Sequence, residues 1–263
     1  MKKPKGIILY KGKSLIDNQI IVAIATGFRD NANYKTGDMI QTWILKADVP
    51  PVLAKRLGFD YSICGDCKQR QFGSCYVNLL HGPCNIYKAY QNGSYEYFDN
   101  SKLKYFKNKD IRIGSYGDPS AIPFNIWDKI CSVTNNYTGY THNWKNCNPD
   151  LKKYCMASVE LQKEYKQAKA MGWRTFRIKT IDDNKMDNEI VCPASIKDNI
   201  NCSKCNLCSG KTNKTNKDIA ITVHGANFKI QRFIKGMKKI KNKKKYKIDY
   251  TKRYEKLRQA CKI

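Results

Sequence analysis

Residues 111–131, IRIGSYGDPSAIPFNIWDKIC, carry the pattern that decides the fold class. A short β-rich segment over 111–115 leads into a Gly-Asp-Pro turn, and residues 122–131 then have the spacing of an amphipathic helix. The same order of strand, polar or glycine turn and helix recurs up to residue 228. Because strands that alternate with helices pair in parallel, the sequence predicts an α/β fold.

The other elements of this region follow the same rhythm. A second helix is expected over 159–172, where Ser158 is placed to cap it and Gly172 can end it. Leu161 and Tyr165 fall on one face of that helix. The further strands are expected over 137–142, 154–158, 175–179, 189–192 and 219–224.

The N-terminal part has a different pattern. Residues 20–48 read as two strands around a polar loop, which predicts a β-hairpin. Five or six strand and helix units fit a complete or partial parallel (β/α) barrel better than an open doubly wound sheet, since no GxGxxG loop is present. We therefore expect a barrel-like domain over 1–228 and a basic, partly helical tail over 229–263.

The apolar runs of the chain are short. The longest, residues 20–25, falls far below the roughly 20 residues of a membrane span, and the N-terminus lacks the apolar stretch of a signal sequence. We expect a cytoplasmic protein with no membrane partner and with reduced thiols. Its 12 cysteines then point first to metal.

The strongest local signal is IVCPASIKDNINCSKCNLCSG, residues 190–210. Cys202, Cys205 and Cys208 have C-x2-C-x2-C spacing, and Cys192 precedes a proline upstream. Bacterial ferredoxins combine this spacing with a remote Cys-Pro around a 4Fe–4S cluster. Tetrahedral zinc could use the same four thiolates, although paired CxxC knuckles are its commoner form. The pattern predicts a metal site and favours iron–sulfur over zinc.

A second set of cysteines lies in SICGDCKQRQFGSCYVN, residues 62–78. Cys64, Cys67 and Cys75 have C-x2-C-x7-C spacing, and Cys84 follows. With Cys84, the site would be closed and structural. Without it, a three-cysteine cluster would keep one iron open, as catalysis requires. The sequence leaves both arrangements open.

The charge balance indicates a nucleic-acid partner, DNA or RNA. The net charge is +27, from 49 basic and 22 acidic residues, and such a field attracts phosphate polymers. Lysines concentrate in the tail, where they can neutralise phosphates without reading bases. The alternative is a solvated, solubilising tail. The lysines expected to bind nucleic acid are Lys238, Lys239, Lys241, Lys243, Lys244 and Lys245.

A set of motifs runs through residues 1–228: TGDMIQTWIL, SICGDCKQR with SCYVN, IRIGSYGDPSAIPFNIW, GYTHNW, CMASVE, GWRTFRI, VCPAS and CSKCNLCSG. Together they resemble a family of uncharacterised phage and plasmid proteins. More loosely, the chain is similar to the phage Gene product 88 family. The resemblance implies a mobile-element protein in the host cell cytoplasm, and a replication role is attached to some relatives.

A more distant resemblance concerns SYGDPSAIPFNIWDKI, residues 115–130. Gly117, Asp118 and Pro119 look like the GGEP-type element that radical SAM enzymes place after the second barrel strand. The likeness implies that Tyr116 and these three residues contact S-adenosylmethionine. The cysteine spacing departs from the C-x3-C-x2-C of those enzymes. Two functions therefore stay open: radical-SAM-like modification of nucleic acid or nucleotides, or a DNA-binding replication protein with structural metal sites and no catalysis of its own.

Overall fold

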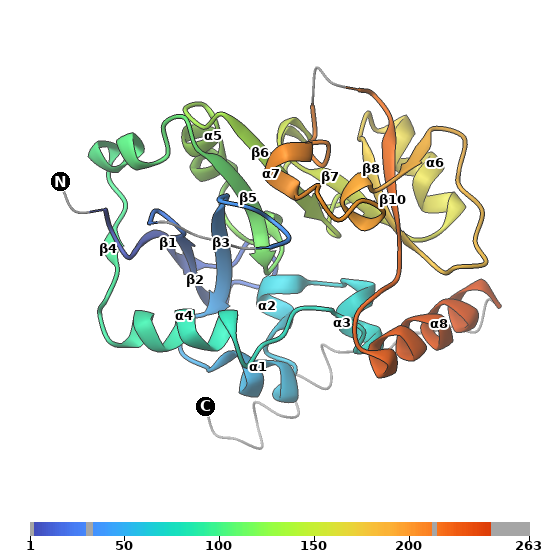
Figure 1. Cartoon of the computed structure of the whole chain (residues 1–263). Coiled ribbons are helices and arrows are strands. Elements are labelled where there is room, and N and C mark those ends of the chain that lie inside the picture. Colours follow the sequence, from blue (N-terminus) through green and yellow to red (C-terminus); the bar gives the residue numbers. More distant parts are fainter. Residues whose placement is uncertain (1–2, 30–33, 212–214, 243–263) are drawn as a thin grey trace.

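The computed structural model describes residues 3–29, 34–211 and 215–242 of the chain. Within these ranges, ten strands form one sheet in the order β4-β1-β2-β3-β5-β6-β7-β8-β10-β9 (Figure 1). The strands are β1 Gly6–Lys13, β2 Ile20–Thr26, β3 Ile40–Lys46, β4 Glu96–Tyr97, β5 Asp110–Tyr116, β6 Asn136–Thr141, β7 Met156–Val159, β8 Thr175–Lys179, β9 Glu189–Val191 and β10 Asp218–Thr222.

The pairing confirms a mixed α/β fold with an N-terminal antiparallel hairpin. β2 pairs antiparallel with both β1 and β3. From β3 onward, every neighbouring pair in the strand order, up to the pair of β10 with β9, is parallel. The six strands predicted between residues 111 and 224 are all present within a few residues of their expected bounds. In the described part of the chain the order has two ends, β4 and β9, so no barrel closure is seen.

Helices and loops cover the two faces of the sheet. The α-helices are α1 Pro51–Leu57, α2 Tyr61–Cys64, α3 Lys68–Phe72, α4 Gly82–Gln91, α5 Phe124–Cys131, α6 Gln162–Ala170, α7 Cys202–Cys205 and α8 Asn227–Lys241. The 3-10 helices are η1 Asn100–Tyr105, η2 Pro119–Ala121, η3 Pro149–Lys153 and η4 Pro193–Ser195. Trp127 of α5 and Tyr165 of α6 pack in the main core with Ile111 and Val159. A smaller core joins Phe176 and Ile219 to Cys208 of the cysteine-rich loop.

The predicted cap of α6 is wrong. Ser158 lies within β7, and its carbonyl oxygen accepts a hydrogen bond from Trp144 Nε1 at 3.1 Å. The cap is supplied from inside the helix, since the Glu164 carboxylate accepts from the backbone N–H of Leu161 at 3.2 Å. The expected end is confirmed: Gly172 follows the helix with a φ of 78°.

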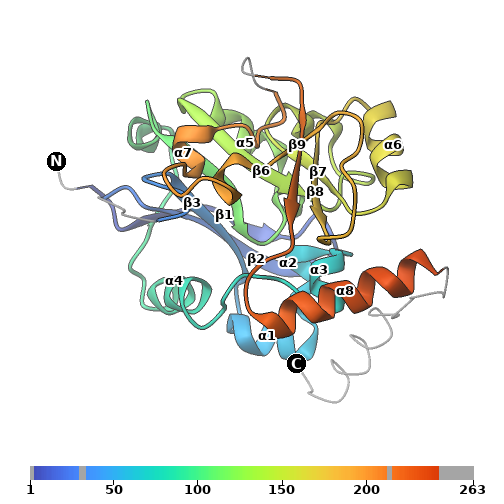
Figure 2. The ribbon, with the colours of Figure 1, turned by 45° about the vertical axis from the view of Figure 1, so that its right-hand side comes forward.

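α8 includes the start of the predicted basic tail. It begins at Asn227 and buries Phe233 and Met237. The Phe233 ring lies 6.4 Å from that of Phe72 in α3, and Figure 2 shows the two helices side by side. Lys238, Lys239 and Lys241 are on this helix, whereas Lys243, Lys244 and Lys245 lie outside the described residues. The docking of α8 was not predicted.

None of the helices in the described ranges combines the length and the apolar character needed to cross a membrane.

Candidate functional site

Cys64, Cys67 and Cys75, the first cysteine group, surround the short helices α2 and α3. Cys64 ends α2 and Cys67 immediately precedes α3. The Cys75 N–H donates to the carbonyl oxygen of Gln69 at 3.1 Å, which turns the chain back after α3. Gly73, with a φ of 67°, makes that reversal at no steric cost.

The three thiols are close enough to act on one another electrostatically. Burial raises the pKa of all three, and it does so most strongly for Cys64 and Cys67. The charge of Cys75 raises the pKa of both Cys64 and Cys67 further. The buried group therefore favours neutral thiols unless a cation joins it, because a bound metal reverses this balance.

The Tyr116–Pro119 loop lies against the first cysteine group. The Asp118 N–H donates to the carbonyl oxygen of Ile63 in α2 at 2.6 Å. Burial raises the pKa of Tyr116, and the nearby Cys64 raises it further. The Tyr116 hydroxyl is buried and has no hydrogen-bond partner among the described residues. The hydroxyl is therefore a polar group beside the thiols that could bind a ligand.

Asp118 ties two strand ends together. Its carboxylate accepts hydrogen bonds from the backbone N–H of Ser120 at 3.0 Å and of His142 at 2.7 Å, and from Thr141 Oγ1 at 2.7 Å. The side chain is thus occupied by donors of the protein, which gives it a structural role in joining β5 to β6.

Gly117 permits this loop to approach β3. Its φ is 85°, and a Cβ at this position would lie 2.6 Å from Ile44 Cβ. We expect Gly117→Ala to lower the free energy of unfolding by about 2–3 kcal/mol, measured by urea denaturation. Gly93→Ala is the matched control, because Gly93 has a φ of 65° but no atom within 4 Å of the added Cβ. An equal effect in both variants would mean that backbone strain, and not close packing on Ile44, constrains the loop.

A buried ionic cluster lies beside Cys67, and sequence reasoning missed it. Lys68 Nζ contacts the carboxylates of Glu160 at 2.7 Å and Glu164 at 2.6 Å. His142 Nδ1 lies 3.8 Å from Glu160 Oε1, and the Glu160 side chain is fully buried. One signal was available: Glu160 directly follows β7, and functional residues of barrels concentrate where strands end.

The second cysteine group comes from two segments of the C-terminal half and consists of Cys192, Cys202, Cys205 and Cys208. Cys192 follows β9, whereas Cys202 and Cys205 are the first and last residues of α7. The Cys208 carbonyl oxygen accepts from the Gly139 N–H of β6 at 2.9 Å. Burial raises the pKa of Cys208 to about 12, and the charges of the other three cysteines contribute to that rise.

Arg112 of β5 lies between the two cysteine groups. Its Nη2 donates to the Tyr76 hydroxyl at 2.9 Å, and its guanidinium lies 5.7 Å from the Tyr140 ring centroid. Burial acts to lower the pKa of Arg112, but the tyrosine hydroxyls and the thiols of Cys202 and Cys208 outweigh it and raise the pKa. In the ranges described, no carboxylate forms an ion pair with Arg112.

The donor chemistry of both groups fits a metal, but the side chains do not yet converge. Thiolates are the ligands that zinc and iron–sulfur clusters prefer. Within residues 3–29, 34–211 and 215–242, no set of three or more Cys, His, Asp or Glu side chains is placed to hold one ion. The sulfurs of each group must turn toward a common centre to do so. Cys84 lies in the first turn of α4, where its N–H donates to the Leu79 carbonyl at 3.0 Å.

Comparisons of the chain with protein-family models, with curated proteins and with solved structures give no match. The function must therefore be argued from the sites themselves.

Proposed function

We propose that this chain is a metal-cluster protein of a phage or plasmid that acts on or beside nucleic acid. The observation that carries the proposal is the second cysteine group, in which four thiols from two separate segments act on one another electrostatically and two of them, Cys202 and Cys208, also act on Arg112. The form proposed for the sheet is a partial (β/α) barrel, with the first cysteine group and the Tyr116–Pro119 loop at the carboxyl ends of its strands.

The surroundings of Arg112 favour a negatively charged metal–thiolate site in the second cysteine group over four neutral thiols. A partly buried guanidinium is always protonated and needs a negative partner, and the described carboxylates supply none. Four thiolates around a metal would provide that negative charge. The C-x2-C-x2-C spacing with the upstream Cys192-Pro193 favours a 4Fe–4S cluster over zinc.

The first cysteine group supports an enzymatic form of the proposal. Cys64, Cys67 and Cys75 would hold a cluster with one iron free of protein ligands, and S-adenosylmethionine bound there would supply radical chemistry. The Tyr116 hydroxyl and the backbone of Gly117 would line that position. Lys68 and Glu160 would hold the Cys67 turn in place through their buried ion pair.

A specific observation favours the second candidate, a DNA-binding replication protein whose metal sites are structural. The Asp118 carboxylate is fully used by three donors of the protein, as a joint between strand ends requires. In that case the first cysteine group braces the loop and performs no chemistry.

One experiment separates the candidates. The full chain is purified without oxygen, iron, acid-labile sulfide and zinc are measured per chain, and absorption spectra are recorded with and without S-adenosylmethionine. Iron and sulfide in cluster amounts with a spectral change would support the enzyme. Zinc alone, or a cluster whose spectrum does not change with S-adenosylmethionine, would support the structural role. A chain that holds neither iron nor zinc would contradict the proposal.

The contribution of α8 to nucleic-acid binding is best tested by charge removal. Deleting α8 would expose the surface that covers Phe233 and Met237, so a truncation would confound binding with folding. For Lys238→Gln with Lys241→Gln, we expect the slope of log affinity against log salt to fall by about 1–2, because each phosphate contact contributes nearly one. The control is Lys163→Gln with Lys166→Gln on the exposed face of α6. The same fall in both pairs would show that only net charge matters.

A further inference from the structure

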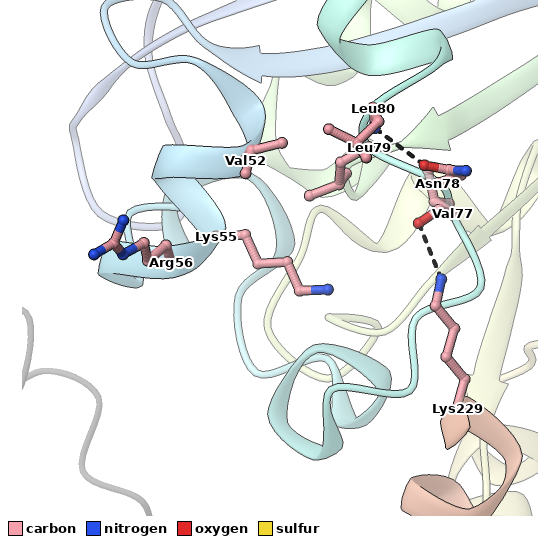
Figure 3. A pocket seen from close by; sticks show the side chains of 8 residues that line it. All are labelled: Val52, Lys55, Arg56, Val77, Asn78, Leu79, Leu80 and Lys229. Atoms are coloured by element: carbon pink, nitrogen blue, oxygen red, sulfur yellow. Dashed lines mark hydrogen bonds between the residues drawn. The ribbon is translucent and has the colours of Figure 1, made fainter. Parts of the chain in front are cut away.

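A hollow of about 440 Å³ lies beside the first cysteine group, between α1, residues 77–80 and the start of α8 (Figure 3). We call it the basic hollow, because Lys55, Arg56 and Lys229 are among the residues that line it. Its volume is within the roughly 300–1,000 Å³ of pockets that bind small ligands. Figure 3 shows Lys55 and Lys229 reaching toward the space between the helices, whereas the Arg56 guanidinium points away.

The cations of the basic hollow form no close ion pairs within the described ranges, although the charge of Lys55 does act on Asp60. Among the residues that the structure describes, no carboxylate forms an ion pair with Lys55, Arg56 or Lys229. Lys229 Nζ donates only to the Val77 carbonyl oxygen, at 3.4 Å, among the hydrogen bonds of that part of the chain. Burial lowers the pKa of Lys229, and the charge of Lys55 lowers it further.

Helix geometry explains Lys55 and Arg56 but not Lys229. Cations in the last turn of α1 are favourable, since a helix carries partial negative charge at its C-terminus. Lys229 lies in the first turn of α8, where the partial charge is positive and a cation is unfavourable. The Ala226 cap also provides no side chain for the free N–H groups of that turn. An anion in the hollow would offset all of these positive charges.

The remaining wall is apolar and partly open to solvent. Val52 is 42% exposed and Leu80 is 72% exposed, and Val77 and Leu79 also line the hollow. Unpaired cations next to exposed apolar side chains suit a ligand with a charged end and a flat or apolar body. A bare inorganic anion would leave the apolar wall unused.

We propose that the basic hollow binds one nucleotide unit, with Lys55 and Lys229 on its phosphate and with Val52 and Leu80 against its sugar or base. The inference deepens the proposed function, on which it rests for the identity of the partner as nucleic acid or nucleotide. Cys75 is close enough to both lysines for their charges to act on its thiol. The bound phosphate would therefore lie beside the first cysteine group.

The test uses the full chain and isothermal titration at low salt. The probes are 5′-AMP, adenosine, inorganic phosphate and a ten-residue oligothymidylate. We expect 5′-AMP to bind more tightly than adenosine or phosphate. Lys55→Gln with Lys229→Gln should weaken binding about 10- to 100-fold, as expected for losing charge-assisted hydrogen bonds to a phosphate. Lys163→Gln with Lys166→Gln removes the same charge elsewhere and should change the affinity less than about twofold.

The two probe classes distinguish the source of the nucleotide. Binding of oligothymidylate but not of 5′-AMP, with the same dependence on Lys55 and Lys229, would assign the hollow to an internal phosphate of a strand. Equal losses in both lysine pairs, or adenosine binding as tightly as 5′-AMP, would overturn the inference. Metal content is measured on the same samples. A chain without metal that still binds 5′-AMP through these lysines would contradict the proposed function alone.

Discussion

Cys208→Ala should abolish metal binding by the second cysteine group and lower the free energy of unfolding by more than about 4 kcal/mol. The reason is that the free energy of a structural metal bound only by the folded chain adds to its stability. Cys208 is 8% exposed and joins the cysteine-rich loop to β6 through its backbone. Metal per chain and urea denaturation, both without oxygen, measure the two effects.

The control for this variant is another buried cysteine. Cys131→Ala removes a thiol that is 5% exposed and lies in α5, outside both cysteine groups. It should cost only about 1 kcal/mol, the price of a small cavity, and leave the metal content unchanged. If Cys208→Ala and Cys131→Ala had equal effects, Cys208 would be a packing residue and the second group would hold no metal.

Lys68→Ala should lower the free energy of unfolding by about 3–5 kcal/mol. It leaves the fully buried Glu160 carboxylate without its main cation, and an uncompensated buried charge is far more costly than a lost surface pair. Urea denaturation at neutral pH measures the loss. Because Lys68 immediately follows Cys67, metal content at the first cysteine group should fall with it.

Two further variants test whether the stranded charge of Glu160 causes the loss of stability. Lys102→Ala breaks the pair of Lys102 with Glu96, whose carboxylate is about half exposed, and should change the stability far less than Lys68→Ala does. Adding Glu160→Gln to Lys68→Ala replaces the stranded charge with a neutral amide, and stability should partly recover. A double variant no more stable than Lys68→Ala would place the effect in packing and not in charge.

The ion pair of Lys68 with Glu160 also makes the stability of the fold depend on pH. Burial would raise the pKa of Glu160, but Lys68 and His142 lower it below its usual value. A carboxyl whose folded pKa is depressed stabilises the fold above its unfolded pKa of about 4.3, and this is lost as pH falls through the folded pKa. The difference in stability between the native chain and Lys68→Ala should therefore shrink below about pH 4. A difference that stayed constant down to pH 3 would contradict this assignment.

The sequence predicted the strands better than their arrangement. Alternation of β-rich and helical segments located every strand between residues 111 and 224, because burial on one or both faces selects β-branched and aromatic residues. It did not predict β1, whose three adjacent buried residues Ile7, Ile8 and Leu9 do not alternate, since a bulge interrupts the pairing. Nor could it place β10 between β8 and β9, because a strand sequence does not specify its neighbours.

For the sites, the spacing of residues along the sequence singled out candidate groups whose members are close in the chain. It missed the groups that folding assembles from distant segments. Cys202, Cys205 and Cys208 are recognisable because a short loop fixes their separation. Lys68 and Glu160 are 92 residues apart, and only folding brings them together. Arg112 was missed because a single arginine in a strand has no motif. Its meaning lies in what surrounds it, Tyr76 and the second cysteine group.

The position of β10 has a consequence for how the protein is made. β9 bonds only to β10 among the described strands, so this edge of the sheet stays incomplete until residues 218–222 have left the ribosome. Cys192 follows β9 directly, and its N–H donates to the carbonyl oxygen of Ala220 in β10 at 2.8 Å. The second cysteine group can therefore assemble only late in synthesis, after most of the sheet is in place. If this group holds the proposed metal, the metal can bind it only after β10 has paired with β8 and β9.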